Sequence, residues 1–386
     1  MQPPPKPWKR AIFSSIAAVE SALGRRESHS PAELLQIRNF LVLQYDSPLG
    51  SVVHATPFYE ALKTAIPDAH VTVAASSMAA SVLQHNPFVD HCVLTAQPFQ
   101  SFLPAFRDVR QLVGTMPAGP RCIVTTIGNQ RTRVAALGFG AGGGTRAGYT
   151  LAPDLYRIPL VFRPERGQIE GNLDILRALG HGIPFYEPRV FFTNLEAEYA
   201  DQVLTPAVGD RRPLVAFVTQ NSGGQRNQWP QDRFKQVIAK LSAECGATPL
   251  FLGTAADEKA IESLRSALPG RGISLAGKTT VPQLAAMLAQ CDLVVSLDTG
   301  TFHVARAVGL PGLVIAPAWQ SPREWLPVDH PRYRVLRGPS IATVPDTYCI
   351  EEVSVQQVTD AAMHLLSLFP ADEFQRSSRV QRSLRR

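Results

Sequence analysis

The segment SLDTGTFHVARAVGLP at 296–311 combines the residue types best suited to hold a phosphorylated ligand. We interpret it as the end of a buried strand, a turn of Asp298, Thr299 and Gly300, and a helix with His303 in its first turn. The free N–H groups and the dipole of a helix start favour phosphate, and a glycine lets a diphosphate come close. The sequence therefore predicts a diphosphate-binding turn, with the Asp298 carboxylate orienting amides or contacting a sugar hydroxyl. An aspartate helix cap beside a surface histidine is the alternative interpretation.

A second polar segment, TQNSGGQRNQWP at 219–230, follows another predicted strand. Thr219 and Ser222 offer hydroxyl groups, and the Arg226 guanidinium could clamp phosphate oxygens. The Trp-Pro pair that ends the segment would start a helix, because proline suits the first helical position. A second phosphate-binding loop and an ordinary glycine loop are both open interpretations of this segment.

A third segment, QYDSPLGSVVHATP at 44–57, follows the first predicted strand and carries groups that could move a proton. A general base must accept a proton near neutral pH, and Asp46 or His54 could do so. Ser51 lies near them, at the start of a predicted helix. A turn with a helix cap would explain the same residues without any chemistry.

Other patterns argue against further kinds of site. The glycines of GFGAGGG at 138–144 fit G-x-G-x-x-G, but the segment follows a predicted helix and opens none, so we expect a flexible loop and not a dinucleotide fingerprint. No D-x-D pair occurs, which leaves a metal-bridged diphosphate site without support. The 5 cysteines are scattered without C-x-x-C spacing, which indicates a reducing compartment and no structural zinc. We predict neither a metal nor a cofactor.

The elements that must position these segments alternate between strand and helix along the whole body of the chain. Such alternation is typical of parallel sheets with helices on both faces, and it occurs twice in succession. We predict an α/β fold of two Rossmann-like domains with parallel sheets facing across a cleft. The expected divisions are an N-terminal amphipathic helix and linker at 1–37, a first domain at 38–190, a linker at 191–212, a second domain at 213–370 and a basic tail at 371–386.

The charge of the chain, a net +6, is concentrated at its ends. Residues 1–30 carry a net charge of +3 and residues 375–386 a net charge of +5, which leaves −2 for the residues between them. A nearly neutral body argues against a nucleic-acid partner, whereas basic ends suit an anionic membrane surface. Solvated tails without a partner are the alternative. The predicted helix at 8–23 has apolar residues on one face, which suits either lipid headgroups or the protein's own surface.

The chain lacks the ~20-residue apolar run that a membrane span needs, and its start lacks the apolar core of a signal peptide. We expect a cytoplasmic protein that is either soluble or attached peripherally to the inner membrane. Nothing in the sequence indicates the oligomeric state.

Several segments, in the right order between about 39 and 330, resemble glycosyltransferase family 9, the ADP-heptose:lipopolysaccharide heptosyltransferases. NFLVLQYDSPLGSVVHATPFYEALKTAIPDAHVTV is similar to the opening strand, S-x-x-G-D loop and following helix of that family. HNPFVDHCVL resembles its N-P-x-V-D segment, and IEGNLDILRALG its middle helix. LAGKTTVPQLAAMLAQCDLVVSLDTGTFHVARAVGLP resembles its hallmark, and WQSPREWLP the loop after the next strand.

The resemblance implies a GT-B fold whose second domain binds most of a nucleotide-sugar donor, ADP-linked by preference. It implies inverting, metal-independent transfer of a heptose-like sugar to a lipid-linked acceptor, lipopolysaccharide or another cell-envelope glycan. By the same resemblance, Glu258 would bind the ribose, Lys278 and Thr279 would flank the base pocket, and the donor diphosphate and sugar would be held by Asp298, Thr299, Gly300 and His303.

Two positions depart from the family pattern. Ser51 stands where the S-x-x-G-D loop has its presumed catalytic aspartate, and Asn227 stands where a K-x-W-P motif has lysine. A serine hydroxyl is a poor general base, so we expect Asp46 to assist catalysis and Arg226 to supply the missing positive charge. A protein that binds nucleotide or sugar without transfer is the alternative function, and hydrolysis or epimerisation of a sugar nucleotide is a further one.

Overall fold

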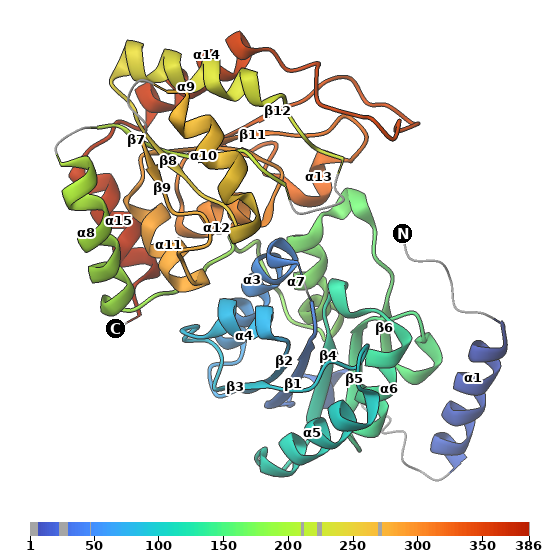
Figure 1. The fold of residues 1–386 in the computed structure, drawn as a ribbon. Helices are drawn as coiled ribbons and strands as arrows, with labels where there is room; N and C mark the ends of the chain where they lie inside the picture. Colours follow the sequence, from blue (N-terminus) through green and yellow to red (C-terminus); the bar gives the residue numbers. More distant parts are fainter. Residues whose placement is uncertain are drawn as a thin grey trace. The chain divides into compact units, whose positions relative to one another are not determined.

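The computed structural model of the 386-residue chain describes residues 7–22, 30–46, 48–209, 212–221, 226–268 and 272–385. The chain divides into two compact units, Met1–Pro188 and Arg189–Arg386. Each unit contains one six-stranded sheet, and helices cover both faces of that sheet (Figure 1). This is the architecture of two Rossmann-like units that the alternating pattern predicts.

The sheet of the first unit has the strand order β3-β2-β1-β4-β5-β6, and all neighbouring strands are parallel. Its strands are β1 Asn39–Gln44, β2 His70–Ala75, β3 His91–Leu94, β4 Arg121–Thr125, β5 Thr145–Tyr149 and β6 Ile158–Leu160. Every residue of β1 is buried, as expected for a central strand covered on both faces. From β1 the chain adds β2 and β3 on one side of the sheet, and it then returns to add β4 on the other side of β1. The direction of strand addition therefore reverses between β1 and β4. Open α/β sheets bind ligands at such a point, beyond the carboxyl ends of the strands.

Two layers of helices enclose this sheet. The α-helices are α1 Pro7–Ala22, α2 Pro31–Leu34, α3 Leu49–Ala65, α4 Ser77–Leu83, α5 Phe102–Thr115, α6 Thr132–Gly140 and α7 Gln168–Ala178. Short 3-10 turns lie at η1 Ile127–Asn129, η2 Pro153–Leu155 and η3 Pro164–Arg166. Helices α5 and α6 share a core with Leu41, Leu43 and Ile123, which fixes β1 and β4 from one side.

The N-terminal helix α1 packs on its own unit. Phe13 and Ile16 contact a small apolar cluster that includes Leu155 and Tyr156. The Ser14 hydroxyl donates a hydrogen bond of 2.9 Å to the Asp154 carboxylate. Of the two interpretations open for this segment, the structure provides the contacts for the protein's own surface. Another side of α1 leaves two apolar side chains exposed, Ile12 and Val19.

The sheet of the second unit repeats the same plan in the order β12-β11-β10-β7-β8-β9, with all neighbours parallel. Its strands are β7 Leu214–Val218, β8 Thr248–Phe251, β9 Ile273–Ser274, β10 Leu293–Leu297, β11 Gly312–Ile315 and β12 Tyr333–Leu336. Its helices are α8 Asn194–Val208, α9 Gln231–Cys245, α10 Glu258–Ser266, α11 Val281–Gln290, α12 Gly300–Val308, α13 Pro322–Trp325, α14 Val355–Leu368 and α15 Glu373–Ser383, with a 3-10 turn at η4 Ala255–Asp257. The change of direction here lies between β7 and β10.

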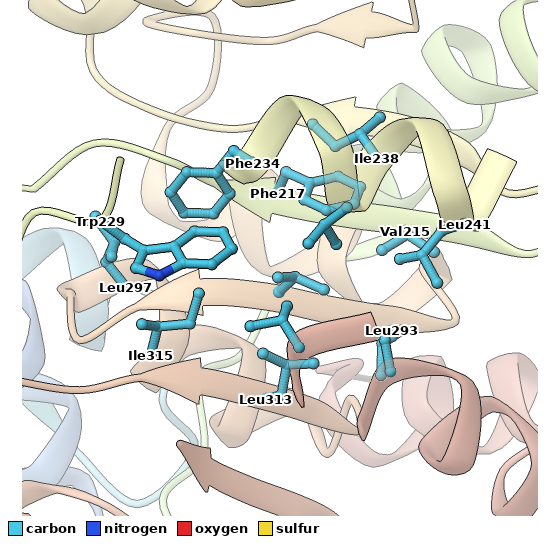
Figure 2. Close-up of a cluster of buried hydrophobic side chains, with 14 of the residues drawn as sticks. Val215, Phe217, Trp229, Phe234, Ile238, Leu241, Leu293, Leu297, Leu313 and Ile315 are labelled. Atoms are coloured by element: carbon cyan, nitrogen blue, oxygen red, sulfur yellow. The ribbon is translucent and has the colours of Figure 1, made fainter. Parts of the chain in front are cut away.

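The Trp-Pro pair at the start of α9 anchors the loop after β7. The Trp229 ring is buried and packs edge-on against Phe234, with ring centroids 4.8 Å apart. Figure 2 shows this pair in the cluster that also contains Leu297 and Ile315 of the strands. The indole N–H donates a 2.9 Å hydrogen bond to the carbonyl of Val353. The end of the polar loop is therefore fixed by the core.

The structure corrects two predicted divisions. The expected linker at 191–212 contains helix α8, which packs on α11. The expected basic tail contains helix α15, which packs on α11 and α12. Both segments carry apolar or long side chains that cover the sheet helices, so they are parts of the second unit.

Two arginines of α15, Arg376 and Arg379, serve the interior of the unit, so the expected basic tail is in part engaged by the protein itself. Arg379 is 5% exposed, and its guanidinium donates to the carbonyls of Ala289 and Cys291. Arg376 lies 3.1 Å from the buried carboxylate of Asp292, which Arg212 contacts at 3.3 Å. A buried carboxylate requires such partners, because an uncompensated buried charge is strongly destabilising.

Among the residues that the structure describes, no helix is both long and apolar enough to cross a membrane.

Candidate functional site

The candidate donor site lies in the second unit, where the sheet changes direction between β7 and β10. Val218 pairs with Ser296, so the loops that follow these strands begin side by side at the carboxyl edge. One loop starts at Thr219, and the other is the turn from Asp298 to Gly300. The structure thus brings together the first two segments that the sequence singles out.

The turn after β10 ends at the start of helix α12 without a side-chain cap. Thr299 occupies the N-cap position with an extended backbone, and its hydroxyl makes no capping hydrogen bond. This hydroxyl is buried, on a residue that is 8% exposed, and it has no hydrogen-bond partner in the part of the chain that the structure describes. The first N–H groups of a helix have no intrahelical acceptor, so this helix start offers them together with a free hydroxyl. An anion would satisfy both kinds of donor.

The Asp298 carboxylate is directed toward the following helix. Its Oδ1 lies 3.5 Å from Nε2 of His303, and both side chains are largely buried, with exposed fractions of 10% and 3%. The alternative of a surface histidine is therefore wrong. The carboxylate thus lies beside the His303 imidazole, whose ring centroid is 6.0 Å from that of Trp325 at the end of α13.

The loop after β7 carries a second set of open polar atoms. The Thr219 side chain is fully buried, and no described residue makes a hydrogen bond with its hydroxyl. The Gln231 amide donates to the Thr219 carbonyl at 3.0 Å, and the buried amide oxygen of Gln231 has no partner among the residues described. Buried polar groups are almost always hydrogen-bonded in native proteins. Unsatisfied atoms from Thr219, Gln231 and Thr299 at one sheet edge therefore indicate a ligand site.

Asn227 links the two loops. Its amide nitrogen donates to the carbonyl of Asp298 at 2.8 Å, and its oxygen accepts from the Asn221 amide at 2.6 Å. The position that is lysine in the K-x-W-P motif thus carries an uncharged bridge here. Arg226 is exposed, and its guanidinium contacts Asp346 at 2.5 Å and the carbonyl of Val344 at 2.9 Å. Its predicted phosphate contact would require release from Asp346.

Three further predicted donor residues lie beyond the neighbouring strands. Glu258 is exposed at the first position of α10, which follows β8. Lys278 and Thr279 follow β9, where the Lys278 ammonium is exposed and lies 3.5 Å from the carbonyl of Ser274. Their roles toward ribose and base stay predictions. Ser222 lies outside the described residues.

The candidate proton-accepting site lies in the first unit, between β1 and β4. Asp46 follows β1 and is 5% exposed. Its Oδ2 accepts hydrogen bonds from the Gln44 amide at 2.5 Å and from the Asn129 amide at 3.3 Å. Asn129 ends the 3-10 turn η1 that follows β4. The same sheet-edge geometry that builds the candidate donor site therefore assembles this carboxyl group.

Burial raises the pKa of Asp46 to about 7, against the lowering effects of the hydrogen bonds from Asn129 and Gln44 and of the Arg131 charge. A carboxyl group with such a pKa exchanges its proton near neutral pH, which is the property required of a general base. The two other residues predicted for this site, Ser51 and His54, lie on helix α3. Ser51 is half-buried in the first turn of α3, and His54 is almost fully buried one turn later.

Sequence reasoning missed several residues at these two edges. Asn129 and Gly128 follow β4, Gln231 begins α9, and Trp325 ends α13. Asn129 could have been found, because it follows a predicted strand just as Asp46 does. Contacts such as that of Trp325 with His303 depend on loop conformations that no sequence pattern specifies. Among the described residues, no three His, Cys, Asp or Glu side chains form a metal-holding group.

Comparisons with known proteins concern the family and the fold of this chain. The family model of glycosyltransferase family 9 (heptosyltransferase) matches residues 131–328. Over 111 residues the chain is 33% identical to lipooligosaccharide heptosyltransferase 2 of Haemophilus influenzae, an alignment that covers 28% of this chain and 32% of that enzyme. This alignment therefore spans about a third of that relative.

Two solved structures share the fold. The crystal structure of a family 9 glycosyl transferase from Veillonella parvula has a TM-score of 0.76 at 20% identity, covering 86% of this chain and 98% of that one. The structure of the Escherichia coli ADP-heptose lipopolysaccharide heptosyltransferase II has a TM-score of 0.69 at 20% identity, covering 85% and 98%. The fold is thus GT-B. Because the family match extends over half of the chain and includes the loops after β7, β10 and β11, this protein belongs to glycosyltransferase family 9.

Proposed function

We propose that the protein transfers a heptose-like sugar from an ADP-linked donor to lipopolysaccharide or a related cell-envelope glycan. The observation that carries this proposal is a pair of buried hydroxyls, on Thr219 and Thr299, that have no hydrogen-bond partner among the described residues and lie beside the uncapped start of α12. The names of the relatives support it, since one is an ADP-heptose lipopolysaccharide heptosyltransferase.

The donor diphosphate is expected at the start of α12. Hydroxyls of Thr219 and Thr299 would donate to phosphate oxygens, and Gly300 would let them approach the backbone. The amide oxygen of Gln231 needs a hydrogen donor, which a sugar hydroxyl offers and an ionised phosphate does not. His303, held by Asp298, would contact the sugar or its phosphate, and Glu258 the ribose, with Lys278 and Thr279 beside the base.

The reaction we propose is a single displacement with inversion. The acceptor hydroxyl attacks the anomeric carbon and loses its proton, while the bond from that carbon to the phosphate oxygen breaks and ADP leaves. Negative charge develops on the departing diphosphate, where the N–H groups and dipole of α12 would stabilise it without a metal ion. Fixed dipoles aimed at this charge are effective because they need no rearrangement during the reaction.

The proposed acceptor is carried by a membrane, so we also propose peripheral attachment at the cytoplasmic face of the inner membrane. The exposed apolar residues Ile12 and Val19 of α1 support this attachment. With Arg376 and Arg379 engaged inside the second unit, the C-terminal helix offers less free charge than its composition indicates.

A binding protein without transfer is the second candidate function. The residues that favour it are Ser51 and Asn227, which replace the aspartate and lysine of the family pattern. Such a protein would bind ADP at the start of α12 and leave the glycosidic bond of the donor intact.

The test is a panel of nucleotides and sugar nucleotides followed by a transfer assay. ADP and ADP-heptose should raise the melting temperature more than UDP and UDP-glucose, because ligand at 100 times its dissociation constant stabilises a protein by about 2.7 kcal/mol. Release of ADP should then require both ADP-heptose and core-truncated lipopolysaccharide. Binding without transfer would favour the second candidate, and no stabilisation by any nucleotide would overturn both.

A further inference from the structure

The Asp46 carboxyl group sits in a polar network built from three separate segments. Gln44 donates to its Oδ2, and the Gln44 oxygen accepts from Tyr59 at 3.2 Å and from Thr126 at 3.3 Å. Asn129 donates to Oδ2 and also to the Thr126 hydroxyl at 2.7 Å. The Asn129 oxygen in turn accepts from the backbone N–H of Tyr45 at 2.6 Å. The network holds the carboxyl group in one orientation.

One oxygen of this carboxyl group is kept apart from the network. Both donors reach Oδ2, and among the described residues none donates to Oδ1. Oδ1 lies directly over Gly128, where a Cβ atom would come within 1.6 Å of it. No residue other than glycine fits at position 128 with the carboxyl group in this place. Gly128 therefore leaves room for an oxygen that accepts no hydrogen bond from the described residues.

We propose that Asp46 accepts the proton of the acceptor hydroxyl, and that Asn129 and Gly128 are the positioning residues that aim its Oδ1. This proposal rests on the proposed function. In the step, the acceptor O–H bond breaks, its proton goes to Oδ1, and the acceptor oxygen forms its bond to the anomeric carbon as ADP leaves with the electron pair of the broken bond. The base of this enzyme has moved from position 51, where the family pattern has aspartate, to the end of β1.

The charged and titratable groups around Asp46 agree with this role. Arg131, which precedes α6, and Tyr59 of α3 are the groups that interact with it electrostatically. Arg131 favours the ionised carboxylate, whereas burial favours the protonated form and is the larger effect. Burial also keeps the pKa of Tyr59 well above its usual value, so Tyr59 remains a neutral hydrogen-bond donor. Asp46 is therefore the group of this network that changes charge near neutral pH.

The test compares four variants for ADP release from ADP-heptose in the presence of core-truncated lipopolysaccharide. Asp46→Asn should lower turnover at least about a hundredfold, the usual effect of losing a general base. Gly128→Ala should show a similar loss, because its methyl group takes the place of Oδ1. Asn129→Leu should raise the pH at which turnover is half-maximal by about one unit, since it removes a hydrogen bond that favours the charged carboxylate.

Asn39→Leu is the matched control, because Asn39 is a buried asparagine at the opposite end of β1. Asn39→Leu should leave the pH profile unchanged, and a merely structural role of Asn129 would do the same. A profile in Asn129→Leu that matches the wild type, or wild-type turnover in Asp46→Asn, would overturn the proposal. A carboxyl-carbon NMR titration that placed Asp46 in the ordinary aspartate range would also overturn it.

The proposed function fails under different results. It fails if the wild-type protein binds ADP and transfers no sugar. A wild-type protein that transfers sugar while Asp46→Asn keeps its turnover would overturn the role of Asp46 alone. The variants lie in the first unit, so ADP should stabilise all of them as it does the wild type.

Discussion

At the scale of single residues, the burial of Asp46 couples the stability of the protein to pH. Its pKa in the folded state is about 7, whereas an aspartate in an unfolded chain titrates near ~3.9. Between these values the folded state binds more protons than the unfolded state, so the free energy of unfolding falls as pH rises. The contribution of Asp46 to the free energy of unfolding is therefore complete below the pKa of the unfolded state and lost above the pKa of the folded state.

Replacing Asp46 with Asn should therefore stabilise the protein at alkaline pH while it abolishes turnover. An asparagine keeps the shape and an acceptor for Gln44 without the buried charge. Urea unfolding at pH 5 and pH 8 should show that the advantage of Asp46→Asn over the wild type grows with pH. If Asp46→Asn and the wild type differed in stability by the same amount at both pH values, the carboxyl group would titrate normally.

The hydroxyls without partners lead to a second prediction at this scale. The double change of Thr219→Val and Thr299→Val should weaken ADP binding by roughly ten- to a hundredfold. Each hydrogen bond to a charged group contributes about 1.5–3 kcal/mol, and its loss is offset in part because a valine side chain is easier to bury than a threonine. The same change should leave the ligand-free protein equally or more stable, since no internal hydrogen bond is lost. Calorimetric titration with ADP measures the first effect and urea unfolding the second.

Thr72 provides the matched control for that pair. It is buried in β2 of the first unit, and within the described ranges its hydroxyl likewise has no hydrogen-bond partner. Thr72→Val should change stability in the same direction without affecting ADP binding. Equal loss of ADP affinity in the control would show that the effect is not local to the donor loops.

The residues of the candidate sites were predictable to different degrees. Asp298, Thr299, Gly300 and His303 are close in sequence, so their grouping at a strand end follows from local pattern alone. Asp46 could be chosen because it follows a strand, but its partner Asn129 comes 83 positions later. Nothing in the sequence indicates which amide meets which carboxylate, since this depends on the register of two strands.

At the scale of elements, helix α15 shows how composition can mislead. Its many arginines and low hydropathy are typical of a solvated tail, yet Arg379 is buried and its pKa is lowered to about 10, chiefly by burial. The physical reason is a pair of carbonyls at the end of α11 and the buried Asp292, which need donors. Such a requirement is visible only once the neighbouring helix is in place.

Replacing Arg379 with Ala should destabilise the second unit by about 2–4 kcal/mol, because two buried carbonyls lose their donors and a buried carboxylate loses a nearby charge. Arg382→Ala is the matched control, since Arg382 lies on the same helix and is exposed. Its effect should stay within about 0.5 kcal/mol. Urea unfolding followed by circular dichroism would measure both, and equal effects would contradict the docking of α15.

The central strands were the predictable elements. Runs such as Asn39–Gln44 and Leu293–Leu297 are apolar because both faces of a parallel strand are covered. The edge strands Ile158–Leu160 and Ile273–Ser274 are too short to leave a pattern. Strand β5 contains Arg146 and Gly148, and neither residue indicates a strand. Gly148 is needed because a Cβ atom there would lie 2.2 Å from the carbonyl oxygen of Thr125.

At the scale of the whole molecule, the proposed membrane attachment rests on few exposed groups. Ile12 and Val19 are 47% and 58% exposed on α1, while Phe13 and Ile16 face the protein. Replacing both exposed residues with Ser should weaken binding to phosphatidylglycerol vesicles about tenfold, by loss of apolar area. Co-sedimentation measures this binding.

The control pair is Val161→Ser with Leu195→Ser, which removes two apolar side chains that are even more exposed and lie outside α1. It should leave vesicle binding unchanged. If both pairs weaken binding equally, or neither does, helix α1 has no special part in attachment. Sequence alone left the place of this helix open, because an amphipathic pattern does not distinguish a lipid surface from a protein surface.

The amide bridge from Asn221 through Asn227 to the carbonyl of Asp298 has one further consequence. A lysine at this position would attract the donor over a distance that dissolved ions screen, with a Debye length near ~10 Å at 0.1 M salt. Here the bridging asparagines carry no charge, and the Arg226 guanidinium forms an ion pair with the Asp346 carboxylate. Recognition by short-range hydrogen bonds should make the affinity for ADP nearly insensitive to ionic strength. Calorimetric titrations between 50 mM and 500 mM potassium chloride would then give similar dissociation constants, and Asn227→Lys would restore a salt dependence.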